Sequence, residues 1–261
     1  MRRTLIDRLP ISLPPELEEL TRGAAIYDSS CSPEARVWFI DKDGGYYLKA
    51  SEKDSLRCEA LMTEYFHRKG LGAGVIYYGS GKRDLLVTER VPGEDCTHPD
   101  LLSKPLWLCD TLATALRELH ETDASDCPIT DRTESYLATA RKNYRAGRHD
   151  LSFFGKGSHS PSPREIYRIV EEGGGLLKNE VLLHGDFCLP NIMIDRGRIS
   201  GYIDLGGAGI GDRHVDVFWG VWTLAYNLKT EEYADRFLDC YGRDKIIPEK
   251  LKIVSAAEVF G

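Results

Sequence analysis

The sequence lacks the cysteine pattern of a disulfide-bonded or zinc-binding protein. Its cysteines number seven, which is odd, and no two of them form a Cys-x-x-Cys pair. This usage is typical of reduced thiols and argues against a disulfide framework or a structural zinc site. The cysteines are Cys31, Cys58, Cys96, Cys109, Cys127, Cys188 and Cys240.

Targeting and membrane-spanning segments are also lacking. Arg2 and Arg3 are followed by no apolar stretch, so the N-terminus does not resemble a signal peptide. The longest apolar stretch, residues 215–228, is too short and too interrupted to span a bilayer. We therefore expect a cytoplasmic protein with no membrane partner.

The sequence also lacks a concentration of positive charge. The net charge is -7, and beyond the first three residues Lys and Arg do not cluster, so we expect no nucleic-acid partner. Mild acidity would suit a cationic substrate, although many cytosolic proteins share it. A chain of 261 residues with 42% hydrophobic residues has room for one large domain or two modest ones, each with a core.

What the sequence does contain is organised around residues 181–216. Asp186 lies in a loop just after a short apolar run, Asn191 follows Asp186 by five positions, and Asp204 closes a later apolar run. The turn Asp195-Arg196-Gly197 would join two of the runs as a hairpin, which brings two carboxylates and an amide to one edge. The strands predicted here cover residues 181–183, 192–194 and 199–203.

These three side chains suit phosphoryl transfer, which depends mostly on positioning and charge neutralisation. Asp186 would orient the acceptor hydroxyl and take its proton, and Asn191 and Asp204 would hold Mg²⁺ against a triphosphate. Kinase catalytic loops carry Asp and Asn at this spacing, followed by a metal-binding Asp. The alternative is that each residue merely ends a turn or hairpin. All three together favour the kinase interpretation.

A second set of residues precedes this region. Lys49 ends a predicted strand and Glu59 lies early in a predicted helix, residues 55–69. A phosphate-binding Lys is commonly fixed by a helix Glu, although the local context alone would favour two surface charges. Ser30 and Ser32 lie in a small-residue loop that suits phosphate binding by backbone N–H groups, or is only a polar loop.

Pro92 and Gly93 end a series of predicted strands, and the chain is then helix-rich up to residue 181. We expect an α+β fold with two lobes: an antiparallel-sheet, nucleotide-binding lobe over residues 1–91 and a helical lobe for catalysis and substrate over 92–261. The usual place for a nucleotide is the crevice between such lobes. Predicted helices cover residues 15–22, 106–120, 131–145, 163–172, 215–228, 231–241 and 248–260; Asp131 with Glu134 and Ser162 with Glu165 are predicted caps.

With these motifs the chain resembles the aminoglycoside 3'-phosphotransferases, antibiotic kinases with a protein-kinase-like fold. The resemblance covers nearly the whole chain. It rests most on His184-Gly185-Asp186, Leu189-Pro190-Asn191-Ile192 and residues 201–206, and also on Leu119-His120, Asp123, Asp126-Cys127-Pro128 and the tail Glu258-Val259-Phe260. It implies transfer of the γ-phosphate of ATP or GTP, with Mg²⁺, to the 3'-hydroxyl of an aminoglycoside, giving antibiotic resistance.

The resemblance also implies a role for each matching position. Asp186 would be the catalytic base, Asn191 and Asp204 the Mg²⁺ ligands, and Lys49, paired with Glu59, the contact to the α- and β-phosphates. The nucleotide loop would contain Ser30 and Ser32, the purine would meet backbone groups of Thr88 and Arg90, and the substrate would lie near Asp150, Glu258 and Phe260.

Departures from the family lie at the acceptor side and after the metal-binding Asp. Gly207 stands where the family usually has Arg, residues 150–162 contain one acid, and Tyr226-Asn227 replaces an acidic pair. Two alternatives therefore stay open: a kinase of the same fold for another antibiotic, an amino alcohol or a sugar, and a non-catalytic nucleotide-binding module. The complete set of kinase residues argues against the second. The acceptor, the choice of ATP or GTP and the oligomeric state are left open.

Overall fold

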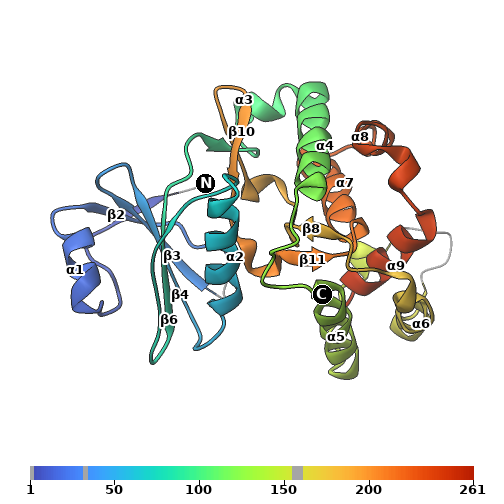
Figure 1. Ribbon diagram of the computed structural model, residues 1–261, viewed down its shortest axis with the longest axis horizontal. Coiled ribbons are helices and arrows are strands. Elements are labelled where there is room, and N and C mark those ends of the chain that lie inside the picture. The colour runs from blue at the N-terminus through green and yellow to red at the C-terminus, as the bar shows by residue number, and fades with distance from the viewer. Residues whose placement is uncertain (1–2, 32–34, 155–160) are drawn as a thin grey trace. The chain divides into compact units, whose positions relative to one another are not determined.

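The computed structural model describes residues 3–31, 35–154 and 161–261 and is drawn in Figure 1. The chain forms two compact units. The first contains Met1–His98 and Pro190–Gly206, and the second contains Pro99–Leu189 and Gly207–Gly261. The predicted lobe boundary after residue 91 stays a prediction.

The first unit is built on a six-stranded sheet in the order β1-β2-β3-β4-β6-β5. Every neighbouring pair is antiparallel, as predicted for this part of the chain. Successive strands that pair directly can be joined by tight turns, which fits the short connections after Asp41 and Ser80. The strands are β1 (Thr4–Ile6), β2 (Ala25–Asp28), β3 (Ala35–Asp41), β4 (Tyr46–Ser51), β5 (Val75–Ser80) and β6 (Asp84–Glu89).

Both faces of this sheet are covered by apolar residues. On one face Leu17 of α1 (Pro15–Thr21) packs into a cluster around Trp38 and Leu48. On the other, Ala60 of α2 (Arg57–Arg68) packs against Leu86 of β6; Figure 1 shows α2 alongside the strands. The side of this helix segment that packs on the sheet is apolar or small, and Leu56, Ala60, Met62, Thr63 and Phe66 are all buried.

A three-stranded sheet, in the order β10-β9-β7, completes the first unit. Arg196 and Gly197, the two residues between β9 and β10, both have positive φ, at 49° and 78°. Two such residues form the type I′ turn that a two-residue hairpin prefers, so the predicted turn is confirmed. The strands are β7 (Glu94–Asp95), β9 (Ile192–Asp195) and β10 (Arg198–Tyr202).

The second unit is mainly helical, with one short antiparallel pair of β8 (Val181–Leu183) and β11 (Gly209–Gly211). In Figure 1, α4 and α7 run side by side. The helices are α3 (Pro99–Leu102), α4 (Pro105–Glu121), α5 (Arg132–Arg145), α6 (Pro163–Gly173), α7 (His214–Leu228), α8 (Ala234–Tyr241) and α9 (Pro248–Glu258). Single 3-10 turns cover Leu151–Phe153, Gly174–Leu176, Leu189–Asn191, Leu205–Gly207 and Arg243–Lys245.

The two predicted helix caps have different outcomes. Ser162 and Glu165 form the complete capping box at the start of α6, as predicted. The predicted cap at α5 is wrong, because the Asp131 side chain accepts no capping hydrogen bond. Instead the Thr133 N–H donates to Asn179 Oδ1 at 3.0 Å, so a distant amide satisfies a donor of the first turn.

Within the ranges that the structure describes, no helix combines the length and the apolar character that crossing a bilayer requires.

Candidate active site

Lys49 is held by two carboxylates in the first unit. From β4 its ammonium donates to both oxygens of Glu59 in α2, at 2.9 and 2.8 Å, and to Asp204 Oδ1, just after β10, at 2.8 Å. The Lys49 and Glu59 side chains are 19% and 10% exposed, whereas Asp204 is 52% exposed. The predicted pairing of Lys49 with Glu59 is therefore present, on two secondary-structure elements that fix both ends.

Burial and the neighbouring charges shift the pKa values of Lys49 and Glu59 in this cluster. Burial alone would lower the pKa of Lys49, but the Asp204 and Glu59 carboxylates outweigh it and raise that pKa. Burial raises the pKa of Glu59, against the effect of the Lys49 charge. Lys49 therefore stays a cation at neutral pH and offers a fixed positive charge to an anionic ligand.

Asn191 and Asp204 lie at the same end of the β9–β10 hairpin. The Ile203 N–H donates to the Asn191 carbonyl at 3.0 Å, which ties the residue before Asp204 to Asn191. Asp204 has a φ of 59°, a left-handed conformation that Asp adopts more readily than most residues. Mg²⁺ takes oxygen ligands, so the Asn191 amide and the Asp204 carboxylate are residues that could hold it.

Asp186 follows β8 in the second unit, in a loop that is braced by Asp216 of α7. The Asp216 carboxylate, which is 0% exposed, accepts hydrogen bonds from the N–H groups of His184 at 2.7 Å and Gly185 at 2.8 Å. Hydrogen bonds from two successive N–H groups to one buried carboxylate fix the backbone just before Asp186. Asp186 itself is half-buried.

The bracing continues behind Asp216. Its Oδ2 lies 3.2 Å from His120 Nε2 of α4, and His120 Nδ1 lies 2.8 Å from the Tyr241 hydroxyl of α8. Burial lowers the pKa of His120, against the effect of the Asp216 carboxylate. The sequence motifs do not indicate Asp216; the available signal is a lone carboxylate near the start of an otherwise apolar helix. The motif Leu119-His120 contains His120 but does not indicate this role.

The close packing of two loops explains why position 207 is a glycine. Gly185 has a φ of 84°, and a Cβ on it would lie 2.0 Å from the Gly207 carbonyl oxygen. A Cβ on Gly207 would in turn lie 2.9 Å from the Gly185 carbonyl oxygen. The two backbones therefore pack directly on each other, and the second glycine allows the loop before Asp186 to approach this closely.

Glu258, at the end of α9 in the second unit, is 7% exposed. Its Oε1 accepts hydrogen bonds from the Tyr136 hydroxyl at 2.9 Å and from Trp219 Nε1 at 3.0 Å. Burial raises the pKa of Glu258 to about 7; the two hydrogen bonds oppose this, and the Asp186 charge adds to it. Asp186 and Glu258, both predicted site residues, therefore interact electrostatically. The sequence motifs do not indicate Tyr136 or Trp219.

A match to the phosphotransferase enzyme family covers residues 31–252. The chain belongs to this family. It is 47% identical, over 249 residues and 95% of both chains, to a probable aminoglycoside 3'-phosphotransferase of Lactococcus lactis subsp. lactis. Membership confirms the predicted class of enzyme, a phosphotransferase.

Two solved structures share the fold of this phosphotransferase. An aminoglycoside-3'-phosphotransferase of type VIII is similar with a TM-score of 0.77 and 23% identity, over 95% of this chain and 100% of that one. The aminoglycoside phosphotransferase APH(3'')-Id of Streptomyces rimosus, in complex with ADP and streptomycin, is similar with a TM-score of 0.69 and 23% identity. The match covers 87% of this chain and 91% of that one. These likenesses confirm the predicted α+β, protein-kinase-like fold class.

The other predicted nucleotide residues of the phosphotransferase lie in the first unit. The Ser30 hydroxyl accepts from the Val37 N–H at 3.0 Å, so it is turned onto its own hairpin. Thr88 lies in β6 opposite Tyr47 of β4. The Arg90 N–H donates to the Gly45 carbonyl at 3.0 Å. Ser32 lies outside the described residues.

The other predicted substrate residues, in the second unit, differ in exposure. Asp150 is exposed and lies beside the C-terminal tail, because its N–H donates to the Val259 carbonyl at 2.7 Å. Phe260 is 1% exposed, and its ring packs edge-on against Tyr144 and Tyr167. The Phe260 side chain therefore serves the core of this unit.

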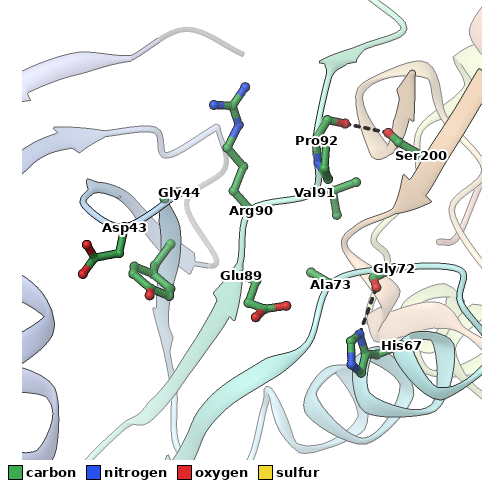
Figure 2. Close-up of a pocket in the computed structure, with 12 residues that line it drawn as sticks. Asp43, Gly44, His67, Gly72, Ala73, Glu89, Arg90, Val91, Pro92 and Ser200 are labelled. Atoms are coloured by element: carbon green, nitrogen blue, oxygen red, sulfur yellow. Dashed lines mark hydrogen bonds between the residues drawn. The ribbon is translucent and has the colours of Figure 1, made fainter. Parts of the chain in front are cut away.

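A cavity of about 320 Å³ lies in the first unit, beside the end of β6. Figure 2 shows Glu89 and Arg90 on its wall, with dashed bonds from His67 to the Gly72 carbonyl and from Ser200 to the Pro92 carbonyl. The cluster around Lys49 is separate from it, because the described lining residues include neither Lys49 nor its partners. The lining consists of Asp43, Gly44, Gly45, Tyr46, His67, Gly72, Ala73, Glu89, Arg90, Val91, Pro92 and Ser200.

Proposed function

We propose that this phosphotransferase moves the γ-phosphate of ATP or GTP to the 3'-hydroxyl of an aminoglycoside and so confers antibiotic resistance. The Lys49 cation, fixed by Glu59 with Asp204 beside it, is the observation that carries the proposal. The name of the Lactococcus relative supports the acceptor, and the ADP in the Streptomyces rimosus structure supports the nucleotide. Its donor nucleotide would place the reaction in the cytoplasm.

The first unit would bind the nucleotide. Lys49 would contact the α- and β-phosphates, held in place by Glu59, and Asn191 and Asp204 would hold Mg²⁺, which neutralises triphosphate charge when bound. The two residues lie at one end of the β9–β10 hairpin, and the Asp204 carboxylate is half exposed and so accessible. The remaining nucleotide contacts would come from Ser30 and Ser32 and from backbone groups of Thr88 and Arg90.

Asp186 would act on the acceptor. Its carboxylate would accept the proton of the acceptor hydroxyl while the hydroxyl oxygen bonds to the γ-phosphorus and the bond to the leaving nucleoside diphosphate breaks. Asp216 fixes the backbone just before Asp186 through two hydrogen bonds. This supports the role of Asp186, because a carboxylate must be held in the productive geometry before transfer.

The acceptor amines would meet Glu258 and Asp150. Glu258 is oriented by Tyr136 and Trp219 through one oxygen, and it lies close enough to Asp186 for their charges to interact. A carboxylate so fixed is suited to an ammonium group of a substrate whose hydroxyl is at Asp186. The tail at Phe260 would help to shape this side through its backbone.

The decisive experiment is a phosphate-transfer assay with ATP and GTP. Kanamycin A carries a 3'-hydroxyl, and tobramycin, which lacks that oxygen, is the matched control. We expect transfer to kanamycin A, none to the 3' position of tobramycin, and loss of transfer when Mg²⁺ is chelated. Equal phosphorylation of both would refute the 3' position. Transfer only to amino alcohols or simple sugars in the same panel would establish the alternative acceptor class.

A further inference from the structure

Aromatic side chains form a row across three strands of the six-stranded sheet. Tyr27 of β2 pairs with Phe39 of β3, and Phe39 pairs with Tyr47 of β4. Directly paired residues project from the same face of a sheet. The centroid of the Phe39 ring lies 6.2 Å from that of Tyr27 and 5.2 Å from that of Tyr47. The three rings therefore make one continuous aromatic surface on strands that Figure 1 shows next to one another.

The row ends between the residues that would bind the two ends of a nucleotide. Tyr47 pairs with Thr88 of β6, whose backbone would meet the purine. Lys49, which would contact the phosphates, comes two positions after Tyr47 in β4. Side chains two positions apart in a strand project from the same face, about 7 Å apart along it. A nucleotide that extends from Lys49 to Thr88 would therefore lie across the Tyr47 ring.

Arg3, just before the edge strand β1, holds two of these rings. Its guanidinium carbon lies 3.6 Å from the centroid of the Phe39 ring and 5.7 Å from that of the Tyr47 ring. Arg3 Nη2 also donates to the Tyr47 hydroxyl at 2.6 Å. A guanidinium suits this place, because it can stack on an aromatic face and donate hydrogen bonds in its own plane at the same time.

The direction of these contacts distinguishes them from the ordinary attachment of an edge strand. The neighbour of β1 in the sheet is β2, yet Arg3 reaches past β2 to residues of β3 and β4. Phe39 is 2% exposed, whereas Tyr47 is half-buried and so remains partly open to a ligand. A tyrosine that is already fixed at its hydroxyl has lost freedom before a ligand arrives, so binding no longer has to order it.

We propose that Arg3 is a positioning residue for the donor nucleotide, whose base lies on the Tyr47 ring that Arg3 fixes. This rests on the proposed function and deepens it, because it assigns part of nucleotide recognition to the residue before β1. Arg3 acts through Phe39 and Tyr47 and not through the phosphates. Its contribution therefore requires a base in the ligand, which separates it from the contribution of Lys49.

The test is the calorimetric affinity of the full chain, with Mg²⁺, for two kinds of ligand. One is ATP or GTP, whichever the wild type binds more tightly, and the other is inorganic tripolyphosphate, which has no base. Arg3→Gln should weaken nucleotide binding by about twofold to tenfold, the cost of ordering one side chain, and leave tripolyphosphate binding unchanged. In turnover it should raise KM for the nucleotide and leave kcat nearly unchanged.

Two further variants make the test specific. Tyr47→Phe keeps the ring but lacks the hydroxyl that accepts from Arg3, so it should show the same loss of nucleotide affinity. The double variant should lose no more than either single variant, because both remove one interaction. Arg8→Gln, at an exposed arginine five positions after Arg3, is the matched charge control and should leave both affinities unchanged. If Arg3→Gln does not fold, Tyr47→Phe decides alone.

Three results would overturn the proposal. Unchanged nucleotide affinity in Arg3→Gln would mean that Arg3 only attaches β1 to the sheet. Tighter nucleotide binding would mean that Arg3 occupies the place of the base. An equal loss of affinity for tripolyphosphate would mean that Arg3 acts through its charge on the phosphates.

The outcomes also separate this proposal from the proposed function. Nucleotide binding that depends on Arg3, without transfer to kanamycin A, would support the role of Arg3 and refute the function. Transfer to kanamycin A with unchanged nucleotide affinity in Arg3→Gln would leave the function standing and overturn the role of Arg3. A wild type that binds neither nucleotide would refute both.

Discussion

The ammonium of Lys49 and the carboxylate of Asp204 lie 2.8 Å apart, although the two residues are 155 positions apart in the chain. In the function that we propose, Lys49 would bind phosphate and Asp204 would bind metal, and the two side chains attract each other through the same charges that would attract those ligands. Their contact keeps both at the mouth of the nucleotide site that we propose.

Replacement of Asp204 tests the metal site. In Asp204→Ala we expect nucleotide affinity to lose its dependence on Mg²⁺, because a carboxylate ligand beside a polyanion is removed. Calorimetry with ATP, with and without Mg²⁺, measures this. Asp195→Ala, in the same hairpin but without contact to Lys49 in the structure, is the control. Undiminished Mg·ATP affinity and turnover in Asp204→Ala would contradict the assignment.

Asp186→Asn tests the catalytic base. The amide keeps the size of the side chain but cannot accept the proton, so we expect turnover to fall by about 10²–10⁴. Stability should change little, because Asp186 is half-buried in a loop and supports no apolar cluster. Steady-state kinetics and thermal unfolding of the same sample separate the two effects. A folded variant with a rate close to that of the wild type would exclude Asp186 as the base.

Asp216→Ala tests the brace behind that loop. Removal of this carboxylate leaves the buried N–H groups of His184 and Gly185 without their acceptor, so the free energy of unfolding should fall by about 2–5 kcal/mol. Asp110→Ala is the control, since it breaks a partly exposed pair with Arg236 and a weak hydrogen bond from Cys240 Sγ, and it should cost about 0–1 kcal/mol. Urea denaturation gives both values. Equal losses in the two variants would mean that Asp216 does not brace the loop.

Gly207→Ala tests the close contact of two backbones. Its Cβ would lie 2.9 Å from the Gly185 carbonyl oxygen, so the loop before Asp186 must shift. We expect a lower kcat and a loss of about 1–3 kcal/mol of stability, as for other forced overpacking. Gly206→Ala provides the comparison in stability, because its Cβ would meet its nearest atom at 3.8 Å. If both alanine variants unfold at the same temperature, the contact does not limit the loop.

The sequence allowed prediction of the parts of the site that local patterns determine. The β9–β10 hairpin follows from two apolar runs around Arg196-Gly197, a pair suited to the positive φ values that it adopts. The Lys49–Glu59 pair follows from a strand and a helix that are close in the chain, since the partners are ten positions apart. Such features need little knowledge of the tertiary structure.

Contacts between distant elements could not be predicted in this way. Asp216 reads as an ordinary polar residue in an apolar helix until packing brings it to His184, 32 positions earlier. Trp219 and Glu258 are 39 positions apart and meet only because α7 packs on α9. The Thr133 N–H is satisfied by Asn179 for the same reason, and so the local cap at Asp131 was wrong.

Glu258 predicts a pH dependence of stability. Burial raises its pKa to about 7, from an ordinary value of 4.5 that the unfolded chain retains. The folded protein therefore binds the proton more tightly, and this contribution to stability is complete below pH 4.5 and is lost as the pH rises through about 7. Glu258→Gln cannot titrate and lacks this dependence.

Urea denaturation of the wild type and Glu258→Gln between pH 4.5 and 8 measures the effect over the window that the two pKa values define. The stability of the wild type relative to the variant should fall across this window by on the order of 2–4 kcal/mol. Asp150→Asn is the control: a hydrogen bond from the Ser152 N–H lowers the pKa of Asp150 below 3.8, so its contribution changes only at lower pH. A constant difference between the wild type and Glu258→Gln would mean that Glu258 is ionised throughout, and that the hydrogen bonds from Tyr136 and Trp219 outweigh its burial.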